Sequence, residues 1–195
     1  MPLDSCVFAS RNAGKLKEVA AFLQPIGMTV HAQPQDIKSA EETGLTFVEN
    51  ALIKARHVAQ HVESPVLADD SGLVVPALGG QPGIYSARYA GQQASSEANM
   101  HQLLRAMESL AGTESQAYFY CTLVLLRTVD DPTPIIASAQ WSGEILRHQS
   151  GVDGFGYDPV FQPAGYEVSA ACLGLKLKNQ ISHRALALQQ LVAVL

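Results

Sequence analysis

The sequence predicts an α/β fold built around a mixed β-sheet. Apolar runs of strand length alternate with longer segments in which apolar residues recur every three or four positions, the spacing of amphipathic helices. Residues 117–126 and 134–146 resemble two strands, and Asp130-Asp131-Pro132 between them is typical of a hairpin turn. Since a hairpin pairs its strands antiparallel, we expect a mixed rather than a purely parallel sheet. The 195 residues suffice for a substantial core, and we expect one domain.

The first predicted strand leads through a polar loop into a helix. The apolar run 6–9 is followed by the loop Ser10-Arg11-Asn12-Ala13-Gly14-Lys15, after which four apolar residues share a helical face: Leu16, Val19, Ala20 and Leu23. Backbone N–H groups and a lysine at a helix N-terminus favour a phosphate. The loop is not a Walker A motif, which would need a Ser or Thr hydroxyl where Leu16 follows Gly14-Lys15. Gly14-Lys15 taken alone is also compatible with an ordinary helix start.

A second helix is predicted next to a short strand that ends in acidic residues. Thr46 and Glu49 form a capping-box pattern, and the apolar residues after them mark one helical face. Residues 65–68 resemble a buried strand that ends at Asp69-Asp70, and we expect Ser71-Gly72 to form a turn. The acids would then lie at the C-terminal end of a strand, where active sites of α/β sheets usually lie.

Four carboxylates lie in the two loops that flank this helix and strand: Glu41, Glu42, Asp69 and Asp70. Oxygen ligands of this kind suit magnesium, which takes one or two carboxylates together with substrate phosphates. For Glu41-Glu42 alone, helix capping or simple solvation is the better interpretation. For Asp69-Asp70, a cation would relieve the repulsion between adjacent carboxylates, so we expect at least one of the two to be functional.

The C-terminal half predicts two further helices and two candidate recognition elements. One helix has an apolar face at Met100, Leu103, Leu104, Met107 and Ala111, and the terminal helix has one at Leu188, Leu191, Val192 and Leu195. Phe155 and Tyr157 lie between glycines, which leaves each ring accessible for stacking on a base, although core packing is the default for either ring. His183-Arg184, with Lys176 and Lys178 before it, is either a basic recognition patch or a helix-end charge cluster.

Composition and charge exclude several function classes. The formal net charge is −5 with no block of like charges, so we expect neither a nucleic-acid polymer nor an anionic membrane as a partner. No apolar stretch has the length of a membrane span, and the N-terminal residues lack the basic region and apolar region typical of a signal peptide, so we expect neither feature. Cys6 and Cys121 lie in strand-like runs far apart, which indicates buried thiols in a reducing compartment. We therefore expect a cytoplasmic protein.

Six segments together resemble one family, the inosine/xanthosine triphosphate pyrophosphatases, also called Ham1-like proteins. They are SRNAGK (10–15), EETG (41–44) with the nearby Phe47 and Glu49-Asn50-Ala51, ADDSGL (68–73), GIYSARY (83–89), GFGYDP (154–159) and ISHR (181–184). Each segment is weak alone, but their order and spacing extend over nearly the whole chain. The resemblance implies a single two-lobed α/β domain over residues 1–195, with a long twisted mixed sheet, a nucleotide cleft between the lobes, and a homodimer.

The resemblance also implies an activity and a set of site residues. The activity is magnesium-dependent hydrolysis of dITP, ITP, XTP and dXTP to the nucleoside monophosphate and pyrophosphate, which removes deaminated purines from the nucleotide pool. The phosphates would be held by Ser10, Arg11, Asn12, Ala13, Gly14, Lys15 and Ser71. The metal would be held by Glu41 and Asp70, with Asp69 as an alternative ligand, and Asp70 would also be the general base. The base pocket would be formed by Phe155, Gly156, Tyr157 and Asp158. Recognition of both phosphate and base would be completed by Lys178, His183 and Arg184.

One segment departs from the family pattern, and two other functions stay open. The family tends to carry an acidic pair ahead of the lysine that aligns with Lys178, whereas residues 171–178 have no acids and include Lys176, which is therefore an alternative substrate lysine. A nucleotide phosphatase or pyrophosphatase of the related Maf type would share the phosphate loop. A non-catalytic nucleotide sensor is the rival from another class, but paired acids beside a triphosphate give a pure binder no advantage.

Overall fold

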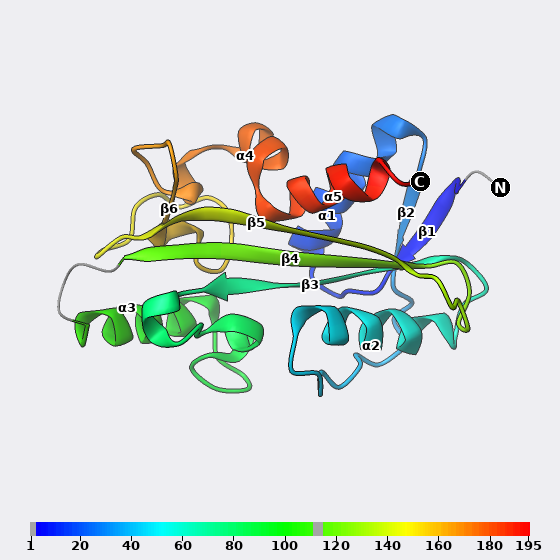
Figure 1. Cartoon of the computed structure of the whole chain (residues 1–195), viewed down its shortest axis with the longest axis horizontal. Coiled ribbons are helices and arrows are strands. Elements are labelled where there is room, and N and C mark those ends of the chain that lie inside the picture. Colours follow the sequence, from blue (N-terminus) through cyan, green and yellow to red (C-terminus); the bar gives the residue numbers. More distant parts are fainter. Residues whose placement is uncertain (1–2, 111–114) are drawn as a thin grey trace. The chain divides into compact units, whose positions relative to one another are not determined.

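The computed structural model describes residues 3–110 and 115–195, which form an α/β fold (Figure 1). The strands are β1 (Ser5–Phe8), β2 (Thr29–Ala32), β3 (Val66–Val74), β4 (Gln116–Leu126), β5 (Ile135–Ile145) and β6 (Phe161–Pro163). The α-helices are α1 (Ala13–Leu23), α2 (Phe47–Ala59), α3 (Ser96–Glu108), α4 (Leu175–Ile181) and α5 (His183–Val192). Short 3₁₀ helices lie at Gln24–Ile26, Pro76–Leu78, Gly83–Arg88, Asp158–Val160 and Ala170–Cys172.

The six strands form one mixed sheet in the order β2-β1-β3-β4-β5-β6. The strand β1 is parallel to both β2 and β3, whereas β5 and β6 are antiparallel. The predicted mixed α/β class is therefore confirmed. The two long strands expected at residues 117–126 and 134–146 correspond to β4 and β5 within one residue.

Contacts divide the chain into two compact units. Unit 1 contains the described residues up to Asp70, together with Cys121–Ala139 and Arg184–Leu195, and unit 2 contains the described residues of Ser71–Tyr120 and Gln140–His183. The strands β3, β4 and β5 each pass from one unit into the other along the chain. A single two-lobed domain with a nucleotide cleft between its lobes stays a prediction.

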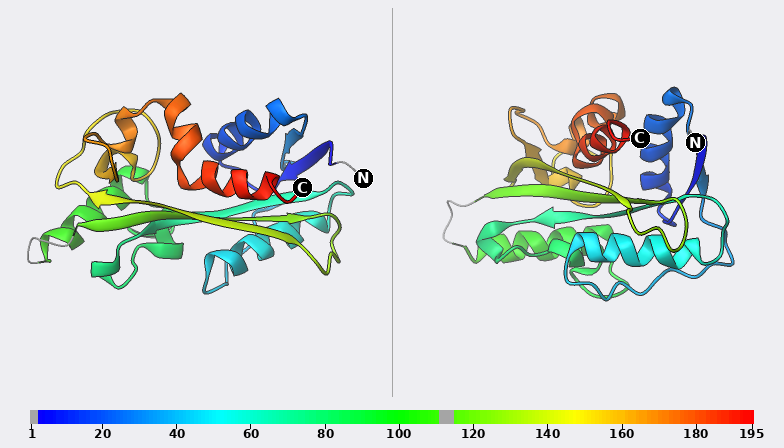
Figure 2. Two further views of the ribbon diagram at one scale, coloured as in Figure 1. Left: turned by 45° about the horizontal axis from the view of Figure 1, so that its top comes forward. Right: turned by 45° about the vertical axis from the view of Figure 1, so that its right-hand side comes forward.

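In unit 1, helices cover both faces of the sheet, α1 and α5 on one face and α2 on the other (Figure 1 and Figure 2). Successive side chains of a strand point to opposite faces of the sheet, so each strand contributes apolar side chains to the cores on both faces. On β3, Leu67 packs in the α1 and α5 core, whereas Val66 and Ala68 pack in the α2 core. The next two residues, Asp69 and Asp70, continue the alternation, so they are expected to face opposite sides of the sheet.

Unit 2 has its own core, centred on aromatic side chains. Phe119 of β4 contacts Phe161 edge to face at 4.8 Å between ring centroids and stacks against Trp141 of β5 at 6.3 Å. Met100 and Leu103 of α3 belong to the same cluster. This confirms the predicted apolar face of that helix over the described residues, and Ala111 lies outside them.

The predicted turn at Ser71-Gly72 is wrong, because β3 continues from Val66 to Val74. The aspartates therefore lie inside a strand rather than at its end. Pairing within the sheet and ion pairs to both aspartates outweigh the local turn preference of Ser-Gly, which is only a weak signal. The short elements β2, β6 and α4 were not predicted either, and α5 ends at Val192, before Leu195.

The predicted start of α2 and the thiol environments are confirmed, whereas α1 begins at Ala13, within the predicted loop 10–15. The side chain of Asn12 caps α1 by accepting a hydrogen bond from Lys15 N, and that of Thr46 caps α2 by accepting one from Glu49 N. Cys6 and Cys121 are buried, whereas Cys172 is exposed. The longest described α-helices have 13 residues, and none has the length and hydropathy that crossing a bilayer requires.

Candidate functional site

The predicted phosphate loop leads directly into the N-terminus of α1. Ser10 Oγ accepts a hydrogen bond from Asn12 N at 3.2 Å, and Asn12 Oδ1 accepts one from Lys15 N at 3.0 Å. The first-turn N–H groups of a helix lack intrahelical acceptors and lie at the positive end of the helix dipole. A pocket of about 440 Å³ opens there, lined by Ser10, Arg11, Asn12, Ala13, Leu16, Ala32, Gln33 and Gln35. The site is suited to an anion.

Arg11 fixes this loop to the chain segment that follows β2. Its guanidinium donates hydrogen bonds to the carbonyl oxygens of Gln35 at 2.9 Å and Ile37 at 2.7 Å. The side chain amide of Gln33 donates to the same Ile37 oxygen at 2.8 Å. Arg11 therefore links the phosphate loop to the segment that leads to Glu41 and Glu42.

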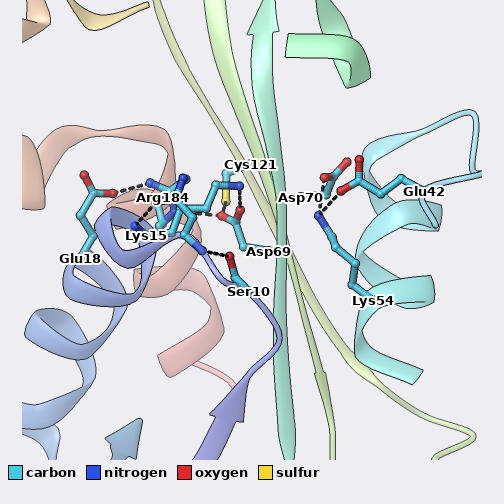
Figure 3. Close-up of polar contacts among 10 residues, drawn as sticks. Ser10, Lys15, Glu18, Glu42, Lys54, Asp69, Asp70, Cys121 and Arg184 are labelled. Atoms are coloured by element: carbon cyan, nitrogen blue, oxygen red, sulfur yellow. Dashed lines mark hydrogen bonds and ion pairs between the residues drawn. The ribbon is translucent and has the colours of Figure 1, made fainter. Parts of the chain in front are cut away.

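Asp69 is the centre of a buried network of charged groups (Figure 3). Lys15 Nζ pairs with one of its oxygens, Arg184 Nε donates to the other at 2.9 Å, and the thiol of Cys121 donates to that oxygen at 3.2 Å. Arg184 also pairs with Glu18 on α1. Burial by itself raises the pKa of Asp69, but the cationic side chains of Arg184 and Lys15 hold that pKa well below its usual value. Asp69 is therefore an ionised anchor for Lys15 and Arg184.

Asp70 faces the other side of the sheet and contacts a different lysine. Lys54 Nζ of α2 lies 2.6 Å from Asp70 Oδ1 and 3.1 Å from Glu42 Oε1. The second oxygen, Asp70 Oδ2, is buried and has no hydrogen-bond partner among the described residues. Burial raises the pKa of Asp70, and the nearby Lys54 opposes that shift without cancelling it. Figure 3 shows the two aspartates on opposite sides of β3, each directed at its own set of cations.

The acidic loop before α2 is held by side chains of that helix. Asn50 Oδ1 accepts a hydrogen bond from Gly44 N at 2.9 Å, and Glu49 accepts one from Leu45 N at 2.8 Å. Glu42 reaches Lys54, whereas the predicted ligand Glu41 is exposed. Of the two adjacent glutamates, the structure thus brings Glu42 to Asp70.

In unit 2, the segment GFGYDP (154–159) places Phe155 against a buried ion pair. Lys178 Nζ lies 2.6 Å from Asp158 Oδ2 and 4.4 Å from the centre of the Phe155 ring. The same Asp158 oxygen accepts a hydrogen bond from Phe155 N at 2.8 Å. At Gly154, φ is +82° and an added Cβ would lie 2.3 Å from Asp158 Oδ2, so only glycine fits this turn. Lys178 is buried in this contact, and the alternative Lys176 is exposed.

The other predicted recognition residues lie in two different settings. Tyr157 is buried in the core of unit 2 and donates its hydroxyl to the Ser86 carbonyl oxygen at 2.8 Å, which is the packing role rather than a stacking role. The imidazole of His183 stacks on Phe119 at 4.8 Å between centroids. Arg184 belongs to unit 1, where Asp69 and Glu18 bind its guanidinium.

Four residues of these networks were not predicted from the sequence to be site residues. Glu18, Lys54 and Asn50 lie on amphipathic helices, and Cys121 lies in a strand, where sequence alone suggests ordinary surface or core positions. One signal was available: Lys54 is one helical turn after Asn50 and next to Ala55, on the face of α2 that is buried. A polar residue at a core-facing helix position indicates a buried partner.

No group of three or more His, Cys, Asp or Glu side chains suited to a metal ion lies together within residues 3–110 and 115–195. The oxygens available near one another are those of Asp70 and Glu42, with Lys54 between them. A helix N-terminus that opens into a pocket, a lysine anchored by a buried aspartate and a second carboxylate on the opposite face of β3 are an arrangement suited to a phosphate-bearing ligand in an α/β protein.

Comparisons with known proteins give the family. The Ham1 family model matches residues 6–194. A dITP/XTP pyrophosphatase of Legionella pneumophila (strain Lens) is 51% identical over 189 residues, which cover 97% of each chain. One of Escherichia coli (strain K12) is 46% identical over 194 residues, covering 99% of this chain and 98% of that one. The structure of a HAM1 protein from Coxiella burnetii has a TM-score of 0.90 and 42% identity, over 97% of each chain. The chain belongs to the Ham1 family.

Proposed function

We propose that this chain hydrolyses dITP, ITP, XTP and dXTP to the nucleoside monophosphate and pyrophosphate. The observation that carries the proposal is that two adjacent aspartates make different contacts. Asp69 forms an ion pair with Lys15 beside the predicted phosphate loop, whereas Asp70 has one buried oxygen without a partner among the described residues. The relatives that match nearly the whole chain are named dITP/XTP pyrophosphatases. Hydrolysis of deaminated purine triphosphates is therefore the function that site and relatives both support.

The phosphate-binding groups are those of the α1 N-terminus. Ser10, Asn12 and the first-turn backbone N–H groups of Ala13 and Gly14 donate to the phosphates, and Lys15 adds a positive charge that Asp69 orients. Arg11 acts mainly by holding the loop, since its guanidinium is bound to the Gln35 and Ile37 carbonyls. Ser71, directly after Asp70 on β3, is the proposed further contact on the phosphate side.

The proposed cofactor is Mg²⁺, held by Asp70 and Glu41. Asp70 fits this ion, because magnesium prefers a few carboxylate oxygens and completes its shell with water and substrate phosphates. Glu41 is exposed and would bind the ion from the loop before α2. Asp70 Oδ2 is a buried oxygen that lacks a partner, whereas both oxygens of Asp69 are already bound to cations or a thiol. Asp70 is therefore preferred over Asp69. When bound, the ion would neutralise charge on the phosphates.

Asp70 is also the proposed general base. A base works best when its pKa is close to the operating pH, and burial shifts the pKa of Asp70 in that direction. Its carboxylate, which has one buried oxygen without a partner among the described residues, would accept a proton from the attacking water. No covalent intermediate is needed for this reaction.

Base recognition is proposed for unit 2 and for Arg184. Phe155 would stack on the purine, with Lys178 and Asp158 fixing its ring and backbone, and Gly156 N–H would donate to the base. Hypoxanthine and xanthine carry an oxygen acceptor at the 6-position where adenine carries an amino donor, so a site that presents donors rejects adenine. Tyr157 and His183 would support this segment from within the core.

The test is a panel of ITP, XTP, GTP and ATP assayed with Mg²⁺, with both products identified. We expect pyrophosphate as the primary product and kcat/KM for ITP and XTP far above that for ATP. Orthophosphate as the primary product, or equal values for ITP and ATP, would favour a general nucleotide hydrolase. A cytoplasmic location and a homodimer complete the proposal, and sedimentation of the purified chain tests the latter.

A further inference from the structure

Lys54 is a nearly buried lysine that none of the predicted roles includes. It lies on α2 between Ala51 and Ala55, both of which are fully buried in the core of unit 1. Its side chain is 15% exposed. A lysine so placed needs anionic partners, because an isolated ammonium group is very unfavourable in the protein interior.

The ammonium group of Lys54 lies between two carboxylates. It is 2.6 Å from Asp70 Oδ1 and 3.1 Å from Glu42 Oε1, and these two residues come from a strand and a loop that are distant in sequence (Figure 3). The remaining oxygen of Asp70 is buried without a partner. Lys54 thus contacts both carboxylates, and Asp70 Oδ2 still lacks a partner. A cation of higher charge would be favoured beside these two carboxylates.

We propose that the Lys54 ammonium occupies the cation position between Asp70 and Glu42 in the metal-free protein, and that a divalent cation must displace it from Asp70. The proposal rests on the proposed function only in taking Asp70 as a metal ligand. Lys54 is then a positioning residue: it holds the acidic loop against β3 before the metal binds. It also lowers the affinity for free metal, because its positive charge repels the ion.

The alternative is that Lys54 stays on Asp70 and helps to build the metal site by orienting its carboxylate. The two possibilities predict opposite effects when the charge is removed. With displacement, Lys54→Met binds the free ion more tightly, since two carboxylates lose their resident cation. With a permanent pair, Lys54→Met binds it more weakly, since Asp70 loses its orientation.

Calorimetric titration of the full chain with Mg²⁺ alone, without nucleotide, separates them. We expect Lys54→Met to bind Mg²⁺ about tenfold or more tightly than the wild type, and Lys54→Arg, which keeps the charge, to bind no more tightly than the wild type. Lys17→Met is the matched control, because Lys17 is an exposed lysine of α1, and its affinity should equal that of the wild type. Unchanged or weaker binding by Lys54→Met overturns the proposal.

A second measurement uses the wild type and does not require the variant to fold. An amine-reactive acetylating reagent, with peptides analysed by mass spectrometry, reports how accessible each lysine is. Labelling of Lys54 should increase severalfold when Mg²⁺ is added, whereas that of Lys17 should not change. Constant labelling of Lys54 at saturating Mg²⁺ contradicts displacement. If instead hydrolysis continues after chelation of all divalent cations, the metal in the proposed function is wrong, and that result is separate from either binding readout.

Discussion

Replacing Asp70 by asparagine should remove activity while sparing the fold. The substitution keeps the shape of the side chain, so an oxygen can still accept a hydrogen bond from Lys54, which also keeps its contact with Glu42 at 3.1 Å. What disappears is the negative charge, and with it the carboxylate that would accept a proton. General-base catalysis contributes about 10²–10⁴-fold, so kcat should fall by on the order of a hundredfold or more.

The stability of the same variant follows from the direction of the pKa shift. Burial raises the pKa of Asp70 in the folded protein above its unfolded value of 3.8, so the protonated form is the one that the fold favours. The stability that this group contributes is fully present below pH 3.8 and is lost as the pH rises through the higher folded pKa. Asparagine is neutral at every pH. In metal-free buffer at pH 7, Asp70→Asn should therefore melt at the same temperature as the wild type or higher.

The assay combines pyrophosphate release from ITP with thermal melts in metal-free buffer between pH 4 and pH 7. Any gain in Tm of the variant over the wild type should increase with pH over this range. Near-normal turnover by Asp70→Asn would reassign the general base. A large loss of Tm at pH 7 would show that the ionised carboxylate is needed for folding, which contradicts the direction of its pKa shift.

Three further predictions concern the neighbouring groups. Asp69→Asn should destabilise the protein by about 3–5 kcal/mol at pH 7, because it leaves Lys15 without its buried counterion and Arg184 with Glu18 alone, and denaturant unfolding measures this. Since the folded pKa of Asp69 lies well below 3.8, the wild type should keep this stabilisation above pH 3.8 and lose it only as the pH falls through the folded value; a loss near pH 6 would point to another group. Lys15→Ala should lower kcat/KM for every triphosphate by about tenfold or more, because the loop is proposed to contact the phosphates and not the base; a selective loss for ITP would place the loop at the base. Arg184→Ala should narrow the preference for ITP over ATP and also lower Tm, since the guanidinium holds Asp69 and Glu18; an unchanged preference would limit Arg184 to a structural role.

Local sequence patterns determined the elements that carry the site. The period of apolar residues indicates the first helix, and the capping box at Thr46 and Glu49 places the start of α2, because capping depends on residues within one turn. The alternation in 117–126 and 134–146 marks β4 and β5. The same local information predicts a phosphate-binding loop before α1, which stays a prediction. The six motifs together indicate the family, which the full-length matches confirm.

Only the tertiary structure decided which charged groups meet. Asp69 and Asp70 are equivalent neighbours in the sequence, but their position inside β3 directs one toward Lys15 and Arg184 and the other toward Lys54. Their different pKa directions follow from that geometry and not from residue type. Lys54 and Glu18 become partners of residues that are distant along the chain, and no local pattern encodes such a pairing. Burial strengthens the attraction within these ion pairs, because charges in the protein interior are poorly screened by water. The packing of α1, α2 and α5 on the sheet therefore determines the direction of the pKa shift of each carboxylate.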